Sequence, residues 1–63
     1  MKKRDIELEL KKYGWWLERQ GSNHEIWTNG ELKEPLARHT EIAEGTARKI
    51  IKKAKRYPGE GKR

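Results

Sequence analysis

Apolar residues between positions 44 and 57 recur with the period of an α-helix. They stand at i, i+3, i+4 and i+7: Ala47, Ile50, Ile51 and Ala54. Basic residues occupy the opposite arc: Arg48, Lys49, Lys52, Lys53, Lys55 and Arg56. This spacing predicts an amphipathic helix whose apolar face is turned to a core. We expect the helix to begin at Thr46 or at residues 44–45 and to end before Pro58.

A second helix is predicted near the start of the chain, over residues 4–13. Ile6, Leu10 and Tyr13 share one helical face, which again points to a core on that side. Gly14 follows directly, and glycine readily ends a helix.

The segment between the helices is predicted to form three short strands, over residues 15–20, 23–28 and 31–37. Aromatic and β-branched residues bounded by turn-forming residues are typical of strands. Asn29-Gly30 favours a hairpin between the second and third strands, because both residues tolerate positive φ. Pro35 cannot donate a ladder hydrogen bond, so we expect the third strand to lie at an edge or to bulge there.

The order of these elements, α-β-β-β-α, defines the expected fold class. It is an α+β fold of two layers, in which two helices cover one face of a three-stranded antiparallel sheet and the other face stays open. We expect residues 1–57 to form a single domain and residues 58–63 to be a flexible tail. A chain of 63 residues can build only one small core.

Composition limits the kinds of site and partner. The chain has no cysteine, which excludes disulfides and thiolate-bound zinc. It lacks the apolar run of a signal peptide or a membrane span, so we expect a cytoplasmic protein. A formal net charge of +6 suits nucleic acid, an anionic membrane surface or an acidic protein. We expect no membrane partner, because the apolar arc of the basic helix is needed for the core.

The tetrapeptide Gly21-Ser22-Asn23-His24 lies between the first two predicted strands. His24 is one of two histidines in the chain, and imidazole exchanges a proton near neutral pH. It can take a proton from an RNA 2′-hydroxyl or return one to a leaving oxygen, while nearby cations neutralise the developing charge. Such a reaction needs no metal, and we expect no cofactor. The plainer alternative is a histidine that caps a turn or lies exposed.

The direction of the His24 side chain stays open in the sequence. If Ile26 faces the core, strand alternation puts His24 on the same side. A bulge, or a place at the very start of the strand, would re-aim it. Ser22 and Asn23 can shape the turn and donate hydrogen bonds.

The remaining candidates also have plain structural explanations. His39 is expected to be a loop histidine, because neither an HxH nor a helical HxxxH spacing occurs that would favour a metal site. Trp16 and Trp27 are candidates to stack on RNA bases at the open face of the sheet, although tryptophan usually fills a core. The cations of the second helix can form a solvated face, but they repel one another unless a polyanion relieves them.

Four motifs together resemble the HicA family of type II toxins. They span nearly the whole chain in the family's order: Gly14-Trp15, Gly21-Ser22-Asn23-His24, Pro35-Leu36-Ala37-Arg38-His39 and Glu44-Gly45-Thr46-Ala47-Arg48-Lys49-Ile50-Ile51. Gly-Ser-(His or Asn)-His is the family's signature, and Gly-Thr before a basic helix is a second match. Trp15 replaces the common Phe. The family's Pro-Arg-His pattern is stretched here, which leaves the role of His39 open.

The resemblance implies a fold like that of double-stranded-RNA-binding domains and the activity of an mRNA interferase. Cleavage would be independent of metal, and the catalytic histidine would be His24. A HicB antitoxin would hold the toxin inactive by covering the active site.

The leading hypothesis is therefore a small endoribonuclease toxin of a type II toxin–antitoxin system, with His24 as its catalytic residue. The expected RNA contacts are Ser22, Asn23, Lys33, Arg38, Lys49, Lys52 and Lys53. We expect the free toxin to be a monomer, although the sequence leaves a dimer open. Two other classes also stay open: a non-catalytic RNA-binding module of the same fold, and an interaction protein whose positive surface meets an acidic partner.

Overall fold

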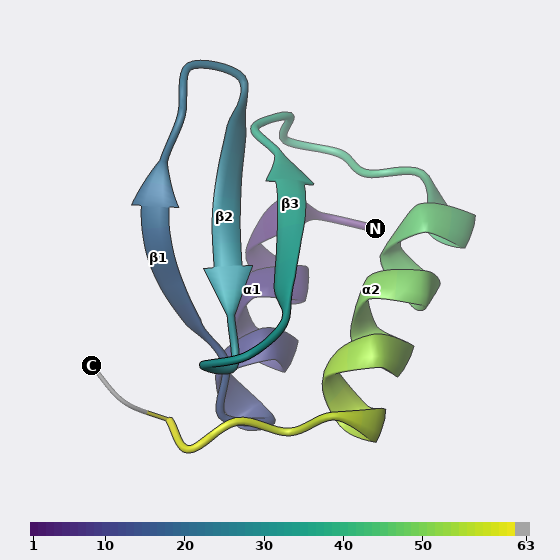
Figure 1. The fold of residues 1–63 in the computed structure, drawn as a ribbon. Coiled ribbons are helices and arrows are strands. Elements are labelled where there is room, and N and C mark those ends of the chain that lie inside the picture. Colours follow the sequence, from purple (N-terminus) through teal and green to yellow (C-terminus); the bar gives the residue numbers. More distant parts are fainter. Residues whose placement is uncertain (62–63) are drawn as a thin grey trace.

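Helices and strands follow one another along the chain in the predicted order. In the computed structural model, which describes residues 1–61, they are α1 (Lys3–Lys12), β1 (Trp16–Gln20), β2 (His24–Thr28), β3 (Lys33–Ala37) and α2 (Glu44–Arg56). The strands form one antiparallel sheet in the order β1-β2-β3 (Figure 1). The predicted α-β-β-β-α fold with an open sheet is confirmed. Over residues 1–61, no helix combines the length and the apolar character that a membrane span requires.

The core lies between the sheet and the two helices, which cover the same face. It is built from residues of both helices and of the sheet and its flanks: Ile6, Leu10, Trp15, Trp27, Leu36, Ile42, Ala47, Ile50 and Ala54. The apolar faces predicted for both helices are thus confirmed. Trp27 is only 2% exposed, so it fills the core, as tryptophan usually does, and its candidate role in stacking on RNA at the open face is wrong. The large indole gains far more from burial than its smaller neighbour Ile26 would.

The phase of β2 decides where His24 points. Trp27 and Glu25 are buried on the helix side, so alternation puts Ile26 and His24 on the open face. Ile26 is half-buried there and His24 is exposed. The sequence left this choice open because Ile26 and Trp27 are adjacent apolar residues, and either phase buries one of them.

The strands that flank β2 differ in regularity. β1 changes register between Leu17 and Arg19, so Glu18 is an extra residue that increases the local twist. β3 lies at the edge of the sheet, with Pro35 opposite Ile26. The predicted edge position is confirmed, and the proline costs no ladder hydrogen bond on the outer side of that strand.

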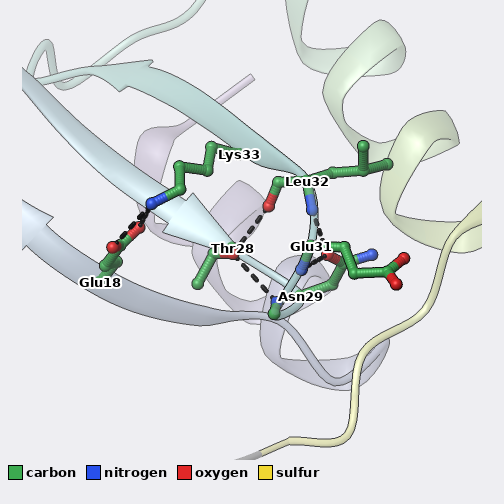
Figure 2. Close-up of polar contacts among 7 residues, drawn as sticks. Glu18, Thr28, Asn29, Glu31, Leu32 and Lys33 are labelled. Atoms are coloured by element: carbon green, nitrogen blue, oxygen red, sulfur yellow. Dashed lines mark hydrogen bonds and ion pairs between the residues drawn. The ribbon is translucent and has the colours of Figure 1, made fainter.

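Side chains organise the turn between β2 and β3, as Figure 2 shows. Asn29 Oδ1 accepts hydrogen bonds from the backbone N–H groups of Glu31 and Leu32, at 2.8 and 2.7 Å. Thr28 Oγ1 accepts from Gly30 N at 3.0 Å and donates to the Leu32 carbonyl at 2.7 Å. Gly30 has a φ of +106°, which glycine adopts without strain. The hairpin is where Asn29-Gly30 predicted it, but its loop is longer than the expected two residues because these side-chain bonds continue to Leu32.

The segment after α2 runs back to the start of β1. Gly59 N donates to the Tyr13 carbonyl at 2.8 Å, and Gly61 N donates to the Gly14 carbonyl at 2.7 Å. The Tyr57 carbonyl accepts the Trp15 indole N–H at 2.8 Å. Residues 62–63 of the predicted flexible tail lie outside the described residues, and the flexibility of the tail stays a prediction.

Candidate functional site

His24 stands at one end of the sheet's open face. It is the first residue of β2 and pairs with Ala37, the last residue of β3. Gly21 N donates to the His24 carbonyl at 2.7 Å, which closes the β1–β2 loop tightly. Because the side chain is exposed, the imidazole can meet a ligand without any rearrangement of the fold.

Arg38 joins this end of the sheet from the neighbouring strand. Its backbone N–H donates to the Asn23 carbonyl at 3.2 Å, and its Nη1 donates to the Gly21 carbonyl at 3.1 Å. A guanidinium carries further N–H donors in a planar fork, which are suited to a phosphate. Four predicted site residues therefore come together here, all of them exposed; we refer to them as the loop cluster: Ser22, Asn23, His24 and Arg38.

The start of the chain holds the connection that follows Arg38. Lys3 N donates to the Thr40 carbonyl at 2.9 Å, and Ile42 N donates to the Met1 carbonyl at 2.8 Å. His39 lies in this connection with an exposed side chain. Backbone hydrogen bonds to the β1–β2 loop and to the first three residues therefore fix the chain on both sides of Arg38.

Lys33 lies at the opposite end of β3 from the loop cluster. It pairs with Thr28, and its Nζ contacts both carboxylate oxygens of Glu18 at 2.8 Å (Figure 2). Four strand steps separate Lys33 from Ala37, a distance of about 13 Å. The structure therefore does not bring Lys33 to His24, and it gives the lysine a carboxylate partner that the sequence did not indicate.

The predicted cations of α2 form a separate group beside β3. They line a groove of about 410 Å³ together with neighbours from both elements: Glu34, Lys49, Lys52, Lys53, Arg56 and Tyr57. Lys53 Nζ lies 2.9 Å from Glu34 Oε1 and 3.4 Å from the Lys33 carbonyl. Arg56 was expected among the basic residues of this helix, whereas the sequence did not indicate that Glu34 and Tyr57 belong to the same group. Tyr57 follows Lys53 by one helical turn, which was the available signal.

Glu25 lies beneath His24 on the helix side of β2, and it is 6% exposed. Its Oε2 accepts from Lys3 Nζ at 2.9 Å, and its Oε1 accepts from the Trp27 indole at 3.0 Å. Lys3 also pairs with Glu7. Burial by itself would raise the pKa of Glu25, but the hydrogen bonds from Lys3 and Trp27 outweigh it and lower the pKa.

The same network acts on Lys3 in the opposite sense. Burial would lower the pKa of Lys3, but its hydrogen bonds to Glu7 and Glu25 and their negative charges raise it overall. This ion pair joins α1 to the residue that follows His24, so it anchors the start of β2. The sequence reasoning missed it, although a glutamate in phase with Trp27 was a usable signal.

Among residues 1–61, no group of three His, Cys, Asp or Glu side chains is placed to hold a metal ion.

The fold and the loop cluster define a class: a small basic α+β domain that presents an exposed histidine and an exposed arginine at one end of its sheet. A family model described as "HicA toxin of bacterial toxin-antitoxin" matches residues 4–55, which is most of the chain. The protein therefore belongs to the HicA toxin family and is a toxin of a toxin–antitoxin system, as its motifs predicted. No curated protein and no solved structure matched the chain.

Proposed function

We propose that this toxin is an endoribonuclease that cleaves mRNA, with His24 as its catalytic residue and without a metal ion. The observation that carries the proposal is the position of His24, exposed on the open face and next to Arg38 in the loop cluster. An imidazole and a guanidinium in one cluster supply a proton carrier and a positive charge, the two things that cleavage of RNA next to its 2′-hydroxyl requires. Because mRNA is the substrate, the toxin acts in the cytoplasm.

The proposed reaction uses the 2′-oxygen of the RNA as its nucleophile. As general base, His24 takes the proton of the 2′-hydroxyl; the 2′-oxygen then bonds to phosphorus, the bond from phosphorus to the 5′-oxygen breaks, and water protonates the leaving oxygen. As general acid, a protonated His24 instead gives its proton to the leaving 5′-oxygen, while water takes the proton of the 2′-hydroxyl. In either role the products are a 2′,3′-cyclic phosphate and a 5′-hydroxyl end. Arg38 neutralises the extra negative charge on phosphorus in the transition state.

The other predicted RNA contacts have different roles. Ser22 and Asn23 donate hydrogen bonds to the RNA next to His24, and the unpaired Lys49 and Lys52 hold phosphates farther along the RNA strand. Lys33 and Lys53 stay in the proposal, but each must release or share a carboxylate before it binds a phosphate.

The antitoxin partner is proposed to be a HicB-like protein that covers the loop cluster. Such a cover removes His24 from contact with RNA, so the complex is expected to bind no RNA at that site and to cleave none. We propose that the toxin released from it is a monomer, which sedimentation at several concentrations would show.

Substitution of His24 is the direct test of the reaction. His24→Ala is expected to reduce RNA cleavage by roughly two to four orders of magnitude, the usual contribution of a general acid or base. His39→Ala removes the other histidine of the chain and is expected to reduce cleavage by less than about tenfold. Cleavage of a labelled RNA in excess EDTA, with analysis of the product ends, measures both variants.

The same assay separates the competing explanations. Equal cleavage by wild type and a folded His24→Ala variant would contradict the proposal. RNA binding without cleavage by any form would instead identify a non-catalytic RNA-binding module, and loss of wild-type cleavage in EDTA would reveal a metal requirement. A single 2′-deoxy substitution at the cleaved bond should stop the reaction, because it removes the nucleophile.

A further inference from the structure

The groove between α2 and the edge of β3 has an unusual lining for a protein of this size. One wall is a helical face whose basic residues stand one turn apart, and the other begins at Glu34 of β3. Tyr57, which is 45% exposed, closes the end. With a volume of about 410 Å³, the groove can accept groups of the size of a nucleotide.

The charges in the groove are not balanced. Lys53 is paired with Glu34 at 2.9 Å. Lys49 and Lys52 are exposed, and their side chains have no hydrogen-bond or ion-pair partner within residues 1–61. Two cations held close together without a counter-charge form a site for a polyanion.

The groove also offers a surface for an unpaired base. Arg56 stands over the Tyr57 ring at 5.6 Å from its centroid, and its Nε donates to the Tyr57 hydroxyl at 3.1 Å. This hydrogen bond holds a guanidinium next to an exposed ring, and nucleobases stack on both tyrosine rings and guanidinium planes. An acidic peptide would use the lysines but has no need of the ring. The lining therefore favours single-stranded RNA over an acidic protein segment.

The groove lies along the chain path that leads to His24. In β3, Glu34 pairs with Trp27 and Ala37 pairs with His24, so three strand steps, about 10 Å, separate these positions along the sheet. Glu34 shares the helix side with Trp27, whereas His24 faces the open side, so a strand that reaches both must also pass around the edge of β3 and needs more than about three nucleotides at ~3.4 Å each. Figure 1 shows α2 running alongside β3 at this edge of the sheet.

We propose that the α2–β3 groove is a second RNA-binding subsite, which holds a phosphate on Lys49 and Lys52 and stacks a base on Arg56 and Tyr57. This inference rests on the proposed function, because it takes the RNA bound at His24 to be the same strand. The groove increases affinity and defines the minimum length of a good substrate. It takes no part in the proton transfers.

The test measures the binding of a labelled 2′-O-methyl RNA, which cannot be cleaved because its 2′-oxygens are blocked. Lys49→Gln/Lys52→Gln is expected to weaken binding of a ten-nucleotide strand by roughly tenfold. The matched control Lys11→Gln/Lys55→Gln makes the same change of charge at exposed residues outside the groove, and it is expected to weaken binding by less than about threefold. Fluorescence anisotropy gives the dissociation constants, and thermal melting confirms that every variant is folded.

Two further comparisons examine the stacking and the span. Tyr57→Leu should weaken binding of the ten-nucleotide strand about fivefold or more, whereas Tyr57→Phe, which keeps a ring, should change it less than about twofold. The gain in affinity from a trinucleotide to the ten-nucleotide strand should be larger for wild type than for Lys49→Gln/Lys52→Gln, because only the longer strand reaches both sites. Equal effects of the groove and control double variants would overturn the proposal, since they would show a general effect of charge.

The outcomes also separate this inference from the cleavage reaction. If wild type cleaves RNA but the groove variants bind it normally, the groove proposal fails and the proposed function stands. If the groove variants lose RNA binding but no form cleaves, the function fails and the subsite stands. If the groove variants bind RNA normally and instead lose affinity for the antitoxin, the groove belongs to a protein interface and the proposal is wrong.

Discussion

Gly14 shows how a single position can be constrained by distant parts of the chain. Its φ is +87°, a backbone conformation that favours glycine. A Cβ added there would lie 2.2 Å from the Gly59 carbonyl oxygen, far inside contact distance. The sequence predicted Gly14 as the end of a helix, but only the folded chain shows the second constraint.

Gly14→Ala is therefore expected to lower the free energy of unfolding by about 2–3 kcal/mol, through the positive φ and the clash with residue 59. Gly45→Ala is the matched control: it lies in the first turn of α2, and a Cβ there meets nothing within 4 Å. That variant is expected to gain about 0.5 kcal/mol from the higher helix propensity of alanine.

Urea denaturation measures both glycine variants. Equal stability of Gly14→Ala and wild type would mean that the segment at Gly59 moves away without cost. Such a result would support the prediction that the residues after Tyr57 are a flexible tail.

At the level of single residues, the loop cluster was largely predictable. Ser22, Asn23 and His24 are neighbours in sequence, so any fold keeps them together. Arg38 joins them because antiparallel pairing of β2 and β3 brings position 37 opposite position 24, and an edge strand in that place was expected. The buried ion pair of Glu25 was not predictable from the sequence. It forms only because α1 packs against the sheet and brings Lys3 next to Glu25.

Between elements, the ion pair of Lys3 and Glu25 makes stability depend on pH. The pKa of Glu25 is lowered, so its contribution is present above its ordinary pKa near 4.5 and is lost as the pH falls through the lower folded value. The pKa of Lys3 is raised, so its contribution is complete below its ordinary pKa near 10.5 and is lost as the pH rises through the higher folded value. Stability should therefore fall at both extremes of pH.

Glu25→Gln is expected to cost about 1–3 kcal/mol at neutral pH, because Lys3 and the Trp27 indole lose a charged partner in the interior. The variant should also show a weaker loss of stability between pH 5 and 2 than wild type. Glu31→Gln, at an exposed residue of the β2–β3 turn, is the control and should behave as wild type. Thermal melting over a pH series provides the measurement. If both variants lost the same amount of stability as the pH falls in acid, the assignment of this pH dependence to Glu25 would be contradicted.

The boundaries of the elements followed from local patterns, whereas the phase of β2 did not. Apolar spacing placed both helices, and Pro35 correctly predicted an edge strand. The same local rules could not choose between Ile26 and Trp27 for the core. Packing chose Trp27, and that choice turned His24 outward.

Over the whole molecule, only some of the positive charges lie at the two proposed RNA sites. Arg38 belongs to the loop cluster, while Lys49, Lys52 and Arg56 belong to the groove. Several other cations face carboxylates, as Lys33 faces Glu18. The net charge of +6 therefore overstates what is available to RNA at any one site.

The salt dependence of RNA binding tests this distribution. Three unpaired phosphate contacts, at Arg38, Lys49 and Lys52, predict a slope of about −2 for the logarithm of the association constant against the logarithm of salt concentration. A ten-nucleotide 2′-O-methyl RNA, titrated at several salt concentrations, gives the slope. A slope near zero would show that the basic residues are only a solvated surface, whereas a slope of about −3.5 would show that Lys33 and Lys53 bind phosphates as well.

The sequence by itself determined the order and type of the elements, the helix faces, the family and the residues of the His24 loop, because all of these depend on local spacing or on contiguous motifs. Tertiary structure alone decided the outward direction of His24, the Lys3–Glu25 pair, the carboxylates that hold Lys33 and Lys53, and the groove beside β3. The physical reason is the same in each case. These features depend on which side chains from distant segments meet when the large indole of Trp27 takes the centre of a small core, and no local pattern records that choice.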